Sequence, residues 1–247
     1  MNQNFILGLL WLLFGTTSLF GTHLDQANQQ FKTGDYAGAV ISYENILAAE
    51  GPRANVFYNL GNSYQQLKQY GPAILAYERA CLLTPRDPDL LANLTLARKA
   101  TASFEELGRY PQVDAVFHYF SLNEWSWLVV GASLVLGCLA LLSGLVRLVK
   151  GGVRQFVGVF ACCAGLVIVA GASALYLRRS EVSRGIILSQ NAEVRLSPFE
   201  KAEVIGKLGP GRIVHLGKQI GDFYDLEVPG ANLRGWMASR DVNAISP

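Results

Sequence analysis

Four asparagines carry the clearest chemical signal in this sequence. They form two pairs with the same spacing of 31 residues, Asn28 with Asn59 and Asn62 with Asn93. An amide side chain offers both a hydrogen-bond donor and an acceptor, which suits the main chain of an extended peptide. The spacing therefore predicts a peptide-binding surface formed by these four residues. The alternative is that they are solvated or cap turns.

Residues typical of catalysis do not gather into a recognisable site. His23, His118 and His215 fall in three different segments, without the spacing of metal ligands. The sequence has no Gly-x-Ser-x-Gly elbow, phosphate loop or His-Glu-x-x-His motif. Asp222 and Asp225 are predicted to be turn residues rather than paired catalytic carboxylates. We therefore expect no enzyme activity, no cofactor and no metal.

Charge and cysteine content exclude two further classes. The formal net charge is +2, and no run of Lys and Arg resembles a phosphate-binding patch, so nucleic acid is not an expected partner. Three of the four cysteines, Cys138, Cys162 and Cys163, lie in long apolar segments, where they behave as small apolar residues. Cys81 stands alone, so a disulfide framework is not predicted.

Apolar residues are concentrated in three uncharged segments, 5–21, 125–146 and 156–177. The last two are each about 22 residues, or about 33 Å as a helix, which is enough to cross a hydrocarbon core of about 30 Å. We therefore predict transmembrane helices over residues 125–148 and 156–177. The alternative is a pair of buried core helices.

Positive charge predicts how this pair of helices is oriented. The linker 149–155 contains Lys150 and Arg154 and no acid, which favours the cytoplasm. Three arginines after the second helix oppose this orientation: Arg178, Arg179 and Arg184. We expect a hairpin in the inner (cytoplasmic) membrane, with both flanking regions on the periplasmic or extracellular side.

The first 21 residues are predicted to be a signal peptide or an uncleaved signal anchor. Phe5 to Gly21 has the apolar middle of a secretory signal, although no Lys or Arg precedes it. Gly21 is the best position for cleavage. Either form exports the chain that follows.

Residues 22–100 contain a period of 34 residues, the length of a helix-turn-helix repeat. The period is visible in three pairs: Tyr36 and Tyr70, Ala39 and Ala73, Tyr43 and Tyr77. One complete unit follows at the same scale: Phe57, Leu60, Gly61, Tyr64, Ala73, Tyr77, Ala80 and Pro85. This order resembles the tetratricopeptide repeat family. The resemblance implies an α-helical solenoid of two repeats plus a capping helix that begins at Asp87-Pro88.

The same resemblance implies a binding mode. In peptide-binding tetratricopeptide proteins, asparagines spaced as they are here face the groove and hydrogen-bond the main chain of the ligand. A protein or peptide partner is therefore expected at the repeat groove. The family's carboxylate clamp also needs Lys and Arg, but the matching positions here are Leu24, Asp89 and Asn93. This difference puts recognition of an acidic C-terminus in doubt.

Residues 101–124 join the repeats to the first apolar helix. Ser103–Glu106 and Ser121–Glu124 both have the pattern of a capping box. An apolar stripe follows the first box: Val113, Val116, Phe117 and Phe120. The stripe predicts a short helix in the membrane interface, or equally a segment packed against the repeats.

Residues 184–247 change to short strands separated by glycines. The predicted strands are 186–188, 192–194, 201–205, 213–216, 224–228 and 235–237. The order of Ala192–Arg195, Gly221–Tyr224 and Gly235–Met237 resembles bacterial SH3-like domains, which implies a small all-β barrel. Members of that family often bind peptidoglycan or peptides. The resemblance implies such a surface at three aromatic residues, which equally suit the barrel core: Phe223, Tyr224 and Trp236.

The combined architecture resembles the BatE-type proteins of bacterial aerotolerance (Bat) operons. That resemblance implies work beside membrane-bound von Willebrand-type proteins and a MoxR-type ATPase. We expect a multidomain protein: a tetratricopeptide solenoid, a two-helix transmembrane hairpin and a small SH3-like barrel. Its expected function is that of an exported, membrane-anchored scaffold whose repeats bind a protein partner. The alternative is an envelope-anchoring protein whose SH3-like domain binds peptidoglycan.

Overall fold

The computed structural model describes residues 17–102, 119–145, 152–181 and 183–246. The chain forms two compact units. The first joins residues 1–106 with residues 185–245, and the second comprises residues 107–184.

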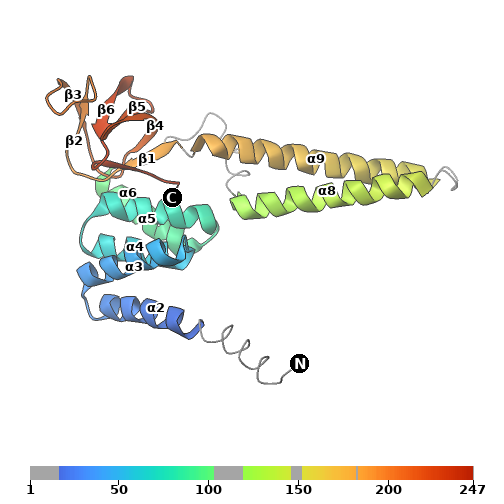
Figure 1. Cartoon of the computed structure of the whole chain (residues 1–247), viewed down its shortest axis with the longest axis horizontal. Coiled ribbons are helices and arrows are strands. Elements are labelled where there is room, and N and C mark those ends of the chain that lie inside the picture. The colour runs from blue at the N-terminus through green and yellow to red at the C-terminus, as the bar shows by residue number, and fades with distance from the viewer. Residues whose placement is uncertain (1–16, 103–118, 146–151, 182, 247) are drawn as a thin grey trace, which may run out of the picture. The chain divides into compact units, whose positions relative to one another are not determined.

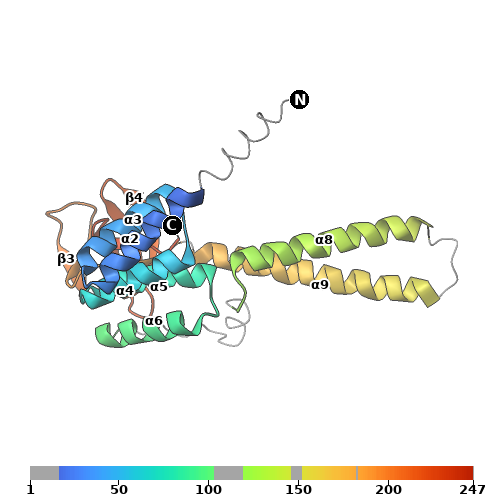
Figure 2. The ribbon, with the colours of Figure 1, turned by 90° about the horizontal axis from the view of Figure 1, so that it is seen from below.

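Five helices form the first part of the first unit (Figure 1): α2 (Thr17–Lys32), α3 (Tyr36–Glu50), α4 (Ala54–Gln66), α5 (Tyr70–Leu83) and α6 (Pro88–Thr101). Each helix packs against the next one along the chain, as Figure 2 also shows. The helical repeats predicted from the 34-residue period are therefore confirmed. The predicted signal boundary after Gly21 falls within α2, and residues 1–16 lie outside the described part of the chain.

Two aspartates begin helices in the way that their positions in the sequence predict. The Asp35 carboxylate accepts a hydrogen bond from the Gly38 amide at 2.9 Å, which caps α3. The Asp87 carboxylate accepts from the amides of Asp89 and Leu90 at 3.0 and 3.2 Å, ahead of Pro88 in the first turn of α6. Both carboxylates therefore satisfy amides that a helix start leaves without partners.

A small residue allows α4 and α5 to approach closely. A Cβ atom at Gly61 would lie only 2.5 Å from Cε1 of Tyr77, so the tyrosine ring occupies the space that a side chain would fill. Tyr77, Ala73 and Ala80 are fully buried on α5. The tetratricopeptide spacing thus places the small residue of one helix opposite the large residue of the next.

The second part of the first unit is an antiparallel sheet of seven strands: β1 (Arg184–Ile187), β2 (Ala192–Arg195), β3 (Val204–Leu208), β4 (Ile213–Ile220), β5 (Phe223–Val228), β6 (Leu233–Ala238) and β7 (Val242–Ala244). Their order is β3-β2-β6-β5-β4-β1-β7. The predicted strands are confirmed as an antiparallel sheet, with β7 in addition. The sheet is not closed, because the strands described at its two ends, β3 and β7, do not pair with each other.

The repeats and the sheet share one apolar cluster. Ile186 of β1 and Ile245, just after β7, are buried against Phe57, Ile74 and Leu90 of the repeats. A second cluster fills the inside of the sheet, with Val194, Leu226 and Met237 among its members. The shared cluster makes the sheet part of the same folded unit as the helices.

The contact with the sheet continues at the start of α5. A Cβ atom at Gly71 would lie 2.4 Å from the carbonyl oxygen of Leu188 and 2.8 Å from that of Ile187. The main chain after β1 therefore passes directly over this glycine, where no other residue would fit without movement.

The second unit contains two long apolar helices, α8 (Leu122–Leu145) and α9 (Gly152–Glu181), which pack against each other. The predicted capping box is present at the start of α8: the Ser121 amide donates to Glu124 at 2.8 Å, and the Glu124 amide to the Ser121 hydroxyl at 3.2 Å. By length and composition, each helix contains a stretch that is able to cross a membrane, Asn123–Leu141 and Val157–Tyr176. The predicted box Ser103–Glu106 and most of the apolar stripe lie outside the described residues.

Candidate functional site: the asparagine pairs of the repeats

The four predicted asparagines lie on alternate helices of the repeats. Asn28 is on α2, Asn59 and Asn62 are on α4, and Asn93 is on α6. These are the first helices of successive repeat units, so equivalent positions on them fall on the same side of the array. The sequence spacing of 31 residues thereby becomes a contact in space.

The first pair consists of Asn28 and Asn59. The Asn59 Nδ2 group donates to Oδ1 of Asn28 at 3.1 Å. The Tyr43 hydroxyl, which comes from the buried face of α3, donates to the same oxygen at 2.7 Å. The Asn28 carbonyl therefore accepts two hydrogen bonds, one from each side.

The second pair repeats this arrangement one unit later. The Asn93 Nδ2 group donates to Oδ1 of Asn62 at 2.9 Å and to the Tyr58 hydroxyl at 3.1 Å. The Tyr77 hydroxyl donates to Oδ1 of Asn62 at 2.7 Å and faces Oε1 of Gln65 at 3.1 Å. Each rung therefore consists of two asparagines and one buried tyrosine.

Burial keeps both tyrosines in the protonated form that can donate. It raises the pKa of Tyr77 well above the ordinary value, and the nearby Tyr58 adds to the rise. Burial also raises the pKa of Tyr43, with a hydrogen bond from Asn59 acting in the opposite direction. At neutral pH both hydroxyls are therefore donors to their asparagine.

Sequence reasoning found the asparagines but not the tyrosines that hold them. Tyr43 and Tyr77 each follow the asparagine that they contact by 15 residues. That repeated offset was visible in the sequence, where both residues had been assigned to packing alone. All four asparagines are partly exposed, so the rungs are accessible from solvent.

The positions that a carboxylate clamp would require carry no cation. Leu24 is half-buried on α2, and Asp89 is exposed one turn before Asn93 on α6. The exposed Asp25 lies three residues before Asn28 on α2. The surface beside the rungs is therefore amide-rich, with acidic residues near each end.

The three aromatic residues predicted on the sheet do not form one surface. Strand register pairs Phe223 with Ala238 and Asp225 with Trp236, whereas Tyr224 pairs with Met237. Because side chains alternate across a sheet, Tyr224 lies on the opposite face from Trp236. Tyr224 packs against the sheet core, and Phe223 is only 7% exposed.

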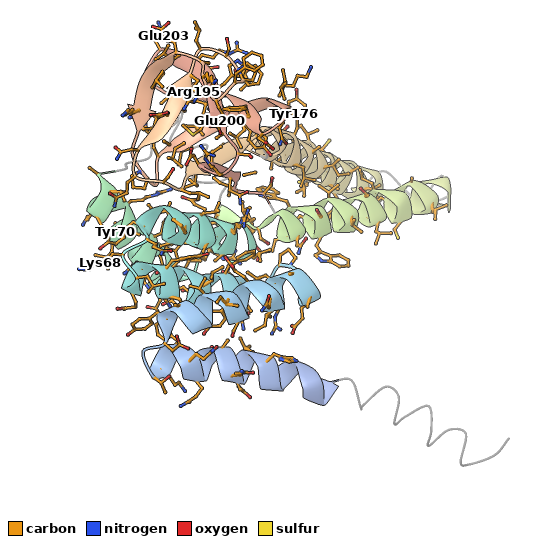
Figure 3. All side chains as sticks on the ribbon, turned by 60° about the vertical axis from the view of Figure 1, so that its left-hand side comes forward. Lys68, Tyr70, Tyr176, Arg195, Glu200 and Glu203 are labelled. Atoms are coloured by element: carbon orange, nitrogen blue, oxygen red, sulfur yellow. The ribbon has the colours of Figure 1, made fainter. Side chains whose placement is uncertain are left out.

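Trp236 lies on a sheet face that is rich in charged residues. The Arg234 guanidinium pairs with the Asp225 carboxylate at 2.7 Å, and this hydrogen bond raises the pKa of the exposed arginine. Arg195 is in register with Trp236 on the neighbouring strand. The Arg195 guanidinium donates to the carbonyl of Glu200 at the turn between β2 and β3, where both residues can be located in Figure 3.

Residues 54–87 match the model of the tetratricopeptide repeat family. The matched range begins with α4, includes all of α5 and ends at the cap of α6. None of the curated proteins compared with the chain matches it. Repeats of this kind generally bind protein partners, and the matched range contains Asn59 and Asn62.

Proposed function

We propose that this protein is an exported, membrane-anchored scaffold whose repeats hold a protein partner. The observation that carries the proposal is the pair of amide rungs, Asn28–Asn59 and Asn62–Asn93, on the first helices of successive units. Partly exposed amides in a regular row suit the main chain of another polypeptide. The match to a protein-binding repeat family over α4 and α5 supports the same role.

The apolar surface of the second unit supports the membrane anchor. Large apolar side chains on α8 and α9 are exposed, with Trp127 at 74% and Leu166 at 71%. An apolar surface on this scale is unfavourable in water and suits a lipid bilayer. We propose that α8 and α9 cross the membrane as a hairpin.

The composition of the first unit supports a common side for both ends of this hairpin. Residues before α8 and residues after α9 belong to one compact unit. A folded unit cannot be divided by a bilayer, so both ends must leave the membrane on the same side. The basic linker 149–155 would then lie in the cytoplasm, with the repeats and the sheet in the periplasm or outside the cell.

Labelling of single cysteines tests this topology. The four native cysteines are replaced by alanine, and Asn55→Cys, Arg212→Cys or Lys150→Cys is introduced into that background. Asn55 and Arg212 should react with a membrane-impermeant maleimide in intact cells, and Lys150→Cys only after permeabilisation. Labelling of Asn55→Cys and Arg212→Cys from opposite sides would exclude the hairpin.

The partner can be tested by crosslinking in membranes followed by mass spectrometry. Asn59→Ala with Asn62→Ala should remove the crosslinked partner while the helical circular dichroism is kept. The matched control is Asn55→Ala, an exposed asparagine on the same helix that belongs to neither rung. We propose that the partner is a von Willebrand-type membrane protein in a Bat/MoxR-type envelope complex. An unchanged set of crosslinks in the double variant would contradict the role of the rungs.

The sheet supports a second candidate function, anchoring to peptidoglycan through an SH3-like surface. The observation in its favour is the half-exposed Trp236 beside the Asp225–Arg234 pair. Cosedimentation with purified peptidoglycan should fall in Trp236→Ala and remain in Phe199→Ala, which removes another exposed aromatic ring of the same sheet. Failure of the wild-type protein to sediment would exclude this function.

A further inference from the structure

We infer that Tyr43 and Tyr77 set the polarity of the four amides, so that the groove reads the main chain of an internal extended segment rather than a free C-terminus. The inference rests on the proposed function, because it names the class of polypeptide that the repeats hold. It makes the two tyrosines positioning residues for the site.

The distances fix which end of each amide faces the tyrosine. The separations from the Tyr43 hydroxyl to Asn28 and from the Tyr77 hydroxyl to Asn62 are both 2.7 Å. That length is typical of a hydroxyl donating to an oxygen, whereas hydrogen bonds involving nitrogen are usually nearer to 2.9 Å. Both hydroxyls are held protonated by burial. Asn28 and Asn62 therefore turn Oδ1 inward.

The second asparagine of each rung must then take the opposite orientation. Asn59 and Asn93 turn Nδ2 inward, toward the oxygens of Asn28 and Asn62. This leaves Nδ2 of Asn28 and Asn62 as donors, and Oδ1 of Asn59 and Asn93 as acceptors. Within the described residues these four atoms have no hydrogen-bond partner.

Each rung consequently presents one donor and one acceptor side by side. A residue in an extended chain presents its C=O and N–H on the same side, and the next residue presents them on the other. One rung thus matches one residue, with Asn28 or Asn62 donating to the C=O and Asn59 or Asn93 accepting from the N–H. The two rungs together read two residues on the same side of the ligand.

A terminal carboxylate does not fit this pattern. It carries acceptors only, so it would face the oxygens of Asn59 and Asn93 without a hydrogen to offer. The nearest charges on the helices that carry the outer asparagines are Asp25 and Asp89, which repel an anion. The favoured ligand is therefore an extended segment with chain on both sides, bound through its main chain.

The test uses the full-length protein in detergent and a library of short random segments, each flanked on both sides by a display scaffold. A selected segment is synthesised with a C-terminal amide, with a free carboxylate, and with N-methyl groups at odd or at even positions. We expect equal affinity for the amide and the acid. Methylation at one parity should weaken binding about tenfold, and methylation at the other should have little effect, because only one parity donates to the rungs.

The tyrosines are tested with the same probes. In the double variant Tyr43→Phe, Tyr77→Phe the amides are free to turn over, so the difference between the two N-methylated peptides should fall to about twofold or less. Tyr36→Phe, the same change outside the rungs, should keep the full difference. A merely structural role for Tyr43 and Tyr77 would weaken both peptides alike and keep their ratio.

The outcomes separate the two levels of the proposal. A selected segment that needs a free carboxylate, or that responds equally to methylation at both parities, would overturn the inference and leave partner binding intact. A ratio that is unchanged in the double variant would also overturn it. A library that yields no segment bound through the rungs would count against the proposed function itself.

Discussion

The Arg79 guanidinium donates a hydrogen bond to the carbonyl oxygen of Ala244 at 2.8 Å and so ties α5 to the last strand of the sheet. It also donates to the carbonyl of Ile245 at 3.2 Å and faces the ring of Phe57. Burial lowers the pKa of this arginine, but an arginine remains charged at any physiological pH. One side chain of the repeats thus holds the main chain at the end of the protein.

Arg79→Ala should destabilise the first unit by about 2–3 kcal/mol, because it leaves buried carbonyls without their charged donor. Urea unfolding followed by circular dichroism measures this loss. The control is Arg212→Ala, which removes an exposed arginine from the same unit. Equal unfolding midpoints for the two variants would show that the contact adds nothing to stability.

Gly71→Ala should also destabilise the unit, because the added methyl group would overlap the carbonyl oxygens of Leu188 and Ile187. The main chain cannot move aside as cheaply as a side chain, so we expect a cost of about 1–3 kcal/mol. Gly209→Ala is the matched control, since open space surrounds that position. A thermal midpoint equal to that of the control would contradict close packing here.

The high pKa of Tyr77 predicts a specific dependence of stability on pH. The native state retains the proton, whereas in the unfolded chain the phenol ionises near the ordinary value of 10.0. The contribution is therefore complete below about pH 10 and is lost progressively as the pH rises toward the native value. Between about pH 9 and about pH 11, the wild type should lose more unfolding free energy than Tyr77→Phe. Parallel pH profiles in urea titrations would refute this prediction.

Asp87→Ala should weaken α6, which carries Asn93, because the carboxylate caps two amides at the start of the helix. A lost N-cap of this type costs about 1 kcal/mol. Hydrogen exchange should become faster in the first turn of α6, with little change in α4. Asp222→Ala, an exposed aspartate at a turn of the sheet, should leave α6 exchange as in the wild type.

The repeat helices could be predicted because their signals are local. Tyr36, Ala39 and Tyr43 recur at a fixed offset, and Asp35 and Asp87 stand where helix caps are needed. The asparagine pairs followed from the same period. The amide polarity did not, because it depends on where the tyrosine hydroxyls lie within the packed helices.

The contact between the repeats and the sheet was beyond reach of the sequence. Arg79 and Ala244 are 165 residues apart, and no periodicity relates them. For the same reason the three-residue strand β7 was not predicted: its partners, β1 and Arg79, lie far away along the chain. Alternation located the other strands but could not indicate that the sheet remains open.

The end strands of this open sheet also bear on how copies of the protein behave when crowded together. Uncovered, regular end strands are templates for strand addition and aggregation. At β7 the carbonyl of Ala244 is already occupied by Arg79, and at β3 the pairing with β2 shifts register between Val194 and Arg195. Such an irregularity bends a strand and disturbs its hydrogen-bond ladder. Neither end therefore offers a flat ladder to a neighbouring molecule, and the fold resists growth into fibres.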